Sequence, residues 1–123
     1  MVTDVTIRWS NATVVLDTKF YGDAVSTYRG RERLHSANLY QLYAYLRNME
    51  ARSGPDSHAS GVLLYPLVDR ALNESVQISG HVISARTVDL SRPWPEIHAE
   101  LLEIVHAARE GAALAPAAAY SEA

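Results

Sequence analysis

The chain has 123 residues, of which 48% are hydrophobic and 20% charged, a balance typical of one globular domain rather than a disordered or fibrous segment. It contains no cysteine, which excludes disulfides and thiolate metal sites and leaves carboxylates, histidines, carbonyls and water as ligands. The formal net charge of -3 excludes binding of nucleic acid through bulk positive charge alone, so any attraction to DNA has to be local.

The sequence shows no segment that would place the chain in a membrane. No apolar stretch approaches the roughly 18 to 20 residues that a spanning helix needs. Residues 1–8 alternate between apolar and polar and lack the continuous apolar run of a secretion signal. We therefore expect a soluble, cytoplasmic protein with no membrane partner.

Two strands joined in a hairpin are predicted at the N-terminus. Residues 3–9 alternate between apolar and polar, which is the period of a half-buried strand. Residues 13–20 are rich in β-branched and aromatic side chains and predict a second strand. A turn at Ser10 and Asn11 is the economical connection, and it pairs residues whose numbers sum to 21.

A helix and further strands are predicted in the middle of the chain. Apolar residues recur at helical spacing between Leu39 and Met49, after possible N-cap residues at 36–38. Residues 61–66 form a short apolar run bounded by glycine and proline, as expected of a buried strand. Residues 76–90 alternate loosely and predict one bent strand or two, with the bend at Gly80.

The C-terminal part is predicted to hold one amphipathic helix over residues 96–109. Residues 111–123 are rich in alanine without an amphipathic pattern, so we expect a domain over 1–110 followed by a flexible tail over 111–123. The five histidines show no metal-ligand spacing and are predicted to lie on the surface; they are His35, His58, His81, His98 and His106.

Three charged residues of the predicted hairpin are the candidates for a metal-dependent catalytic site. The register sets Asp4 opposite Asp17, and alternation places Lys19 on the same face. Facing carboxylates repel unless a divalent cation lies between them, and hydrolysis of a phosphodiester needs such a cation and a nearby positive group. We expect the two predicted helices to cover the apolar face, which comprises Val5, Ile7, Val14 and Leu16.

Plainer interpretations remain open for these residues. A D-x-K triplet by itself is more often an ordinary exposed ion pair than a metal site. The basic segment that holds Arg29, Arg31 and Arg33 has no apolar period and is interpreted as a loop. It could contact a phosphate backbone or simply be solvated.

Taken together, the motifs resemble a known nuclease family. They are Asp4, the segment Asp17-Thr18-Lys19-Phe20, the segment from Asn38 to Tyr45 in the predicted helix, and the run from Gly61 to Pro66. In this order they resemble the nuclease domain of McrC-type endonuclease subunits of the McrBC methylcytosine restriction system. The resemblance implies Asp4, Asp17 and Thr18 as ligands of Mg²⁺ or Mn²⁺, Lys19 as the catalytic lysine, and Gln41 and Tyr45 as a helix pair beside the site.

The resemblance also implies a fold and partners. The fold class is α/β, a mixed sheet flanked by helices in a PD-(D/E)XK core, here without the helix and strand that usually precede the first aspartate. The implied substrate is DNA and the implied partner is a McrB-like AAA+ GTPase, and from their charge Arg29, Arg31 and Arg33 are expected to contact the DNA backbone. The missing elements predict an open sheet edge that self-associates or binds a partner. The alternative function is an inactive nuclease remnant that serves as a protein-interaction module.

Overall fold

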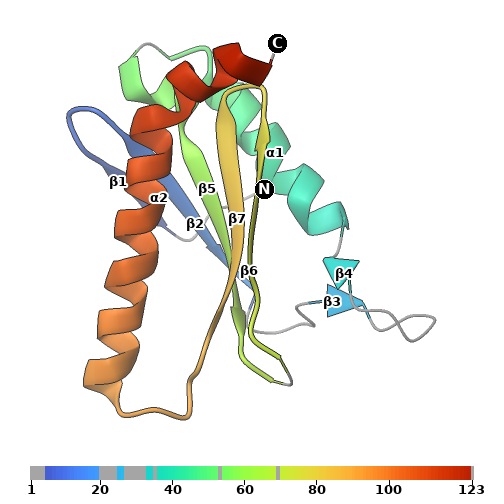
Figure 1. Ribbon diagram of the computed structural model, residues 1–123, viewed down its shortest axis with the longest axis vertical. Coiled ribbons are helices and arrows are strands. Elements are labelled where there is room, and N and C mark those ends of the chain that lie inside the picture. The colour runs from blue at the N-terminus through green and yellow to red at the C-terminus, as the bar shows by residue number, and fades with distance from the viewer. Residues whose placement is uncertain are drawn as a thin grey trace.

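A five-stranded mixed sheet with one helix on each face forms the core of the molecule, which confirms the predicted fold class (Figure 1). The computed structural model describes residues 5–19, 25–26, 33–34, 36–52, 54–68 and 70–122. The elements are β1 (Val5–Arg8), β2 (Thr13–Thr18), β3 (Val25–Ser26), β4 (Arg33–Leu34), α1 (Ser36–Met49), the 3-10 helix η2 (Gly54–His58), β5 (Ser60–Pro66), β6 (Asn73–Ile78), β7 (His81–Val88) and α2 (Trp94–Glu122).

The strands of the large sheet lie in the order β1-β2-β5-β7-β6. The two outer pairs, β1 with β2 and β6 with β7, are antiparallel hairpins. The inner pairs, β2 with β5 and β5 with β7, are parallel. The inner strands are therefore covered on both faces, and β5 is the near-continuous apolar run that this position favours.

The N-terminal hairpin has the predicted register. Val5 pairs with Leu16 and Ile7 with Val14, and the amide of Trp9 donates to the carbonyl of Ala12 at 2.8 Å across the turn. The second strand ends at Thr18 rather than at residue 20. Asp4, expected opposite Asp17, lies outside the described residues.

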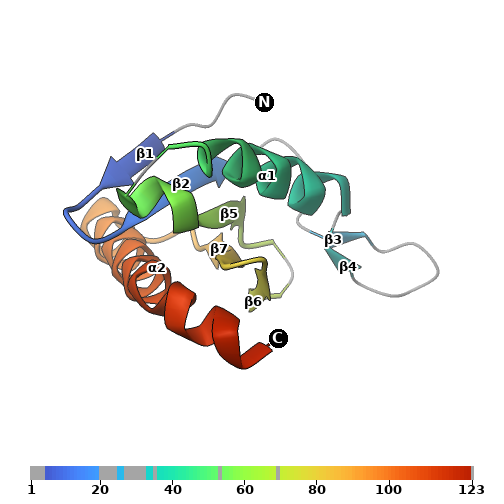
Figure 2. The same cartoon turned by 90° about the horizontal axis from the view of Figure 1, so that it is seen from above.

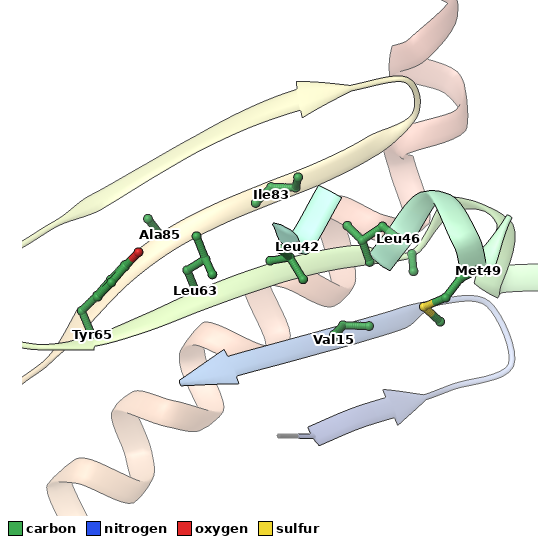
Figure 3. Close-up of a cluster of buried hydrophobic side chains, with 9 residues drawn as sticks. Val15, Leu42, Leu46, Met49, Leu63, Tyr65, Ile83 and Ala85 are labelled. Atoms are coloured by element: carbon green, nitrogen blue, oxygen red, sulfur yellow. The ribbon is translucent and has the colours of Figure 1, made fainter. Parts of the chain in front are cut away.

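The two helices cover opposite faces of the sheet, which corrects the expectation that both cover the apolar face of the hairpin (Figure 2). Each strand of the hairpin sends alternate side chains to each face, so Val14 and Leu16 pack on α2 while Val15 packs on α1. Figure 3 shows the core on the α1 side, which includes Val15, Leu42, Leu46, Met49, Leu63, Tyr65, Ile83 and Ala85.

The predicted bent strand is a hairpin of two strands. Ser79 and Gly80 form its turn with positive φ angles of 52° and 85°, and glycine adopts this backbone region without strain. His81 follows the turn and is fully buried, so the prediction of a surface position is wrong for this histidine. Its two ring nitrogens lie 2.7 Å from the Ala59 carbonyl and 2.6 Å from the Glu50 carboxylate, which satisfies the polar ring inside the core.

Helix α2 is longer than predicted. It begins at Trp94 and ends at Glu122, so its backbone is helical through most of the segment 111–123, and the flexibility of that tail stays a prediction. Alanine has the highest helix propensity, which favours a helix in this segment even without an amphipathic pattern. The guanidinium of Arg109 lies 4.9 Å from the centre of the Trp9 ring and links α2 to the hairpin turn. Among the described helices, none is both long and apolar enough to span a membrane.

Candidate functional site

Asp17 and Lys19 lie at the C-terminal end of β2, on the face that α1 covers. Both have the same parity along the strand as Val15, which packs against α1 in the core. The amide of Lys19 donates to the Leu64 carbonyl at 2.7 Å, so the pairing with β5 continues one residue beyond the last strand residue of β2. This backbone bond fixes the point from which the Lys19 side chain leaves the sheet.

The two side chains form a buried ion pair. The Nζ atom of Lys19 lies 3.2 Å from Oδ2 of Asp17, and the residues are 8% and 3% exposed. Removing two charges from water costs several kcal/mol per ion, and their mutual attraction offsets this only in part. Apolar residues of similar size would be at least as stable here, so stability alone gives little reason for this pair.

Asp17 also has an unused acceptor. Its Oδ2 is buried and accepts no hydrogen bond, because the Lys19 ammonium lies within ion-pair distance without the alignment of a donor. An ionised carboxylate oxygen without a donor is costly inside a protein, and a hard cation coordinates such an oxygen directly. Asp17 therefore fits one ligand position of a divalent cation.

The described residues do not complete a metal site by themselves. Within these ranges, no group of three or more histidine, aspartate or glutamate side chains is placed to hold a metal ion. Asp4, the second predicted carboxylate, is outside them, and Thr18 is the last residue of β2, between Asp17 and Lys19.

Helix α1 crosses the sheet at the level of Asp17. Leu42 packs so closely on Gly61 that a Cβ atom there would lie 2.7 Å from the leucine Cδ2. One turn earlier, Asn38 donates a hydrogen bond to the Tyr65 hydroxyl at 3.2 Å. Since Asp17 pairs with Leu63, midway between Gly61 and Tyr65 on β5, the helix turn that holds Gln41 passes at its level.

The predicted helix pair, Gln41 and Tyr45, lies on α1. Gln41 is exposed and Tyr45, one turn on, is half-buried against the core. The pKa of Arg8 on β1 is raised, chiefly by its hydrogen bond to Asp56, and Tyr45 is near enough to add an electrostatic contribution. Tyr45 is thus near Arg8, at the end of the hairpin away from Asp17, and the placement of Gln41 and Tyr45 beside the Asp17 site stays a prediction.

The predicted basic loop is only partly described. Arg29 and Arg31 lie outside the described residues. Arg33 is in β4, whose backbone pairs with β3, so this part of the segment is a strand rather than a loop.

Sequence reasoning missed a second polar centre, around Asp56. This buried carboxylate accepts hydrogen bonds from Arg8, Thr13 and Arg52 at 2.8 to 3.3 Å. The Arg8 hydrogen bond lowers the pKa of Asp56 below its usual range, Thr13 and Arg52 add to the effect, and burial opposes it. Arg8 and Thr13 lie 48 and 43 positions from Asp56 in the chain, so no spacing in the sequence indicates that they meet it.

The comparison with known proteins found a restriction enzyme. No family model matches the chain. A relative from Escherichia coli (strain K12), the type IV methyl-directed restriction enzyme EcoKMcrBC, is 42% identical over 104 residues, which are 85% of this chain. The matched region is 29% of the length of that relative, so the chain spans less than a third of it. The similarity confirms the relationship to McrC-type subunits that the order of the motifs predicted.

Proposed function

We propose, from the relationship of the chain to a McrBC-type restriction enzyme, that it is a metal-dependent DNA endonuclease domain of a restriction system. The observation that carries the proposal is the buried pair of Asp17 and Lys19, with one carboxylate oxygen that accepts no hydrogen bond. A structural ion pair needs neither burial at this level nor an unused acceptor, whereas a cation site needs both a charged ligand and a free oxygen.

The ligands in this proposal are Asp17, Asp4 and an oxygen of Thr18, and the ion is Mg²⁺ or Mn²⁺. When bound, such an ion would neutralise the phosphoryl oxygens and make water a stronger nucleophile. Hard divalent cations prefer oxygen ligands, and the absence of cysteine from the chain agrees with this choice.

Residues of the chain supply the remaining functions. Lys19 keeps a positive charge beside the Asp17 carboxylate, where it stabilises negative charge that develops on the phosphodiester and orients the attacking water. Gln41 and Tyr45 on α1 contact the DNA beside the site. Arg29, Arg31 and Arg33 bind the DNA backbone, and a McrB-like AAA+ GTPase is the proposed partner.

Plasmid nicking tests the assignment of Asp17 and Lys19 to the catalytic site. Because the pair is buried, the variants have to separate loss of activity from loss of stability. Lys19→Met alone leaves a buried, unpaired carboxylate and should be about 3 kcal/mol less stable than the parent. The double variant Asp17→Asn with Lys19→Met replaces the ion pair by neutral side chains of similar size and should be more stable than Lys19→Met alone, because it leaves no buried charge unpaired. We expect the parent to nick plasmid DNA with Mg²⁺ or Mn²⁺ and the folded double variant to show no nicking above background.

Two outcomes would contradict the proposal. If the double variant nicks DNA as fast as the parent, the chemistry resides elsewhere. If the parent does not nick DNA at all with either ion, the inactive interaction module replaces the nuclease as the best account of the chain.

A further inference from the structure

Two arginines converge on one buried carboxylate at the end of the sheet opposite to Asp17. Arg8, the last residue of β1, donates from Nε and Nη2 to Asp56 at 3.0 to 3.3 Å. Arg52, just beyond α1, donates from Nη1 to the same carboxylate at 3.3 Å. Thr13 of β2 donates its hydroxyl to Asp56 at 2.8 Å, so β1, β2, η2 and the end of α1 meet at this point.

The cluster has more positive charge than Asp56 requires. Two guanidinium groups face one carboxylate, so the cluster has a net charge of +1 while Asp56 stays ionised, as its lowered pKa favours. Asp56 is buried, yet the side chains of Arg8 and Arg52 are 49% and 63% exposed. The carboxylate therefore fixes two arginines that still present much of their surface to solvent.

The position of the cluster relates it to the proposed nuclease site. Arg8 pairs with Thr13 across the hairpin, and Thr13 is on the same face of β2 as Asp17. Thr13 and Asp17 are four residue steps apart along the strand, which is about 13 Å at roughly 3.3 Å per residue. Along one DNA strand, with about 3.4 Å of helix axis per phosphate, this corresponds to about four nucleotides.

We infer that Arg8 and Arg52 form a binding site for a backbone phosphate of DNA, a few nucleotides from the phosphodiester that lies at Asp17. The inference rests on the proposed function, because DNA is the polyanion that such a site serves. A guanidinium group has a planar set of donors that matches phosphate oxygens, and a group held in place loses little conformational freedom on binding. The site also supplies the local attraction that a chain with a net charge of -3 needs in order to bind DNA.

Binding of a fluorescent DNA duplex in EDTA tests the inference without any cleavage. Arg52→Ala is the variant of choice, because Arg8 and Thr13 still satisfy Asp56 after the change. We expect it to melt within about 2 °C of the parent, since Arg52 is 63% exposed and Asp56 keeps its hydrogen bonds from Arg8 and Thr13. Its affinity for DNA should fall roughly tenfold, and the slope of log K against log salt should become less steep by about 0.9.

Arg47→Ala is the matched control. Arg47 is also on the α1 side of the sheet, 54% exposed and ion-paired, here with Glu50 at 3.6 Å, but it lies on the other flank of the helix, beside Tyr43, which bonds to Ser79. We expect this control to weaken DNA binding by no more than about twofold, because it removes charge without a phosphate contact. A duplex of different sequence should give the same result, since phosphate contacts do not read bases.

Several results would overturn the inference. Equal losses in Arg52→Ala and Arg47→Ala would mean that only total charge matters, and an unchanged affinity in Arg52→Ala would mean that the site binds no phosphate. A parent that does not bind DNA would also overturn it, whether or not metal ions stabilise the protein through Asp17. Arg52-dependent binding of a polyglutamate peptide in place of DNA would assign the cluster to an acidic protein partner.

Discussion

At the scale of residues, burial distinguishes the Asp17 and Lys19 pair from an ordinary surface ion pair. The alternation of β2 predicted that the two side chains lie on one face of the strand, and they form an ion pair there. It could not predict that they are 3% and 8% exposed, because burial depends on α1, which packs on this face from a distant part of the chain. The same limit applies to His81, whose partners Glu50 and Ala59 are 31 and 22 residues away in sequence.

Asp56 leads to a prediction about acid stability. The pKa of this carboxyl is lowered in the folded state, first by the hydrogen bond from Arg8, so the stabilisation is present above the unfolded pKa of about 3.9. It is lost as the pH falls through the lower, folded pKa. We expect Asp56→Asn to cost about 2 kcal/mol at pH 7, where the carboxylate accepts several charge-assisted hydrogen bonds, and much less at pH 3.

Urea unfolding of parent and variant between pH 7 and pH 3 measures this difference directly. The two free energies of unfolding should converge as the pH falls below about 4. Thr13→Val serves as a control, because it removes the hydrogen bond from Thr13 to Asp56 and leaves both ion pairs intact. A constant difference between Asp56→Asn and the parent over the whole range would show that the carboxylate charge does not matter.

At the scale of elements, contacts between neighbouring segments were predictable and those between distant segments were not. The register of the β1 and β2 hairpin followed from its short turn and its alternating side chains. The parallel pairing of β2 with β5 joins residues more than 40 apart, and no pattern in the sequence specifies it. For this reason, the placement of α1 and α2 on opposite faces was missed while both helices were recognised.

Gly61 sets the distance between α1 and the sheet. A methyl group at this position would lie 2.7 Å from Cδ2 of Leu42, and Leu42 is fully buried, so it has little room to move. We expect Gly61→Ala to destabilise the fold by about 1 to 3 kcal/mol through overpacking. Chemical unfolding at pH 7 gives this value.

A double-mutant cycle identifies the contact. In a Leu42→Ala background the added methyl group has space, so Gly61→Ala should cost less there than in the parent. Gly61→Ala should also weaken nicking, because it displaces the turn of α1 that holds Gln41. Strictly additive free energies would mean that the two residues do not determine how closely α1 approaches β5.

At the scale of the whole molecule, the resemblance predicted the α/β class, but nothing in the sequence predicted the order of the strands in the sheet. In the described sheet the outer strands are β1 and β6, and Val5 and Val76 on them are 45% and 44% exposed. The expected self-association or partner binding at an open edge remains a prediction. The chain corresponds to 29% of the length of its relative, so the partner subunit and the activity of a whole enzyme are proposals rather than findings.

The charge distribution of the molecule also depends on the fold. The sequence predicted a local basic surface at Arg29, Arg31 and Arg33, because these residues are close together in the chain. Folding brings Arg8 and Arg52 together as well, although 44 positions separate them. An overall net charge therefore says little about where a polyanion binds.

Metal-dependent thermal stability tests the central claim, that the Asp17 site binds a divalent cation, most directly. An ion that binds only the folded state at ten times its Kd stabilises it by about 1.4 kcal/mol, which raises the melting temperature of a domain of this size by roughly 3 to 7 °C. We expect this rise for the parent in manganese relative to EDTA, and for Arg47→Ala as a control. The double variant Asp17→Asn with Lys19→Met should fold and show no rise. A parent without a shift at saturating manganese, or a double variant with the same shift as the parent, would contradict the claim.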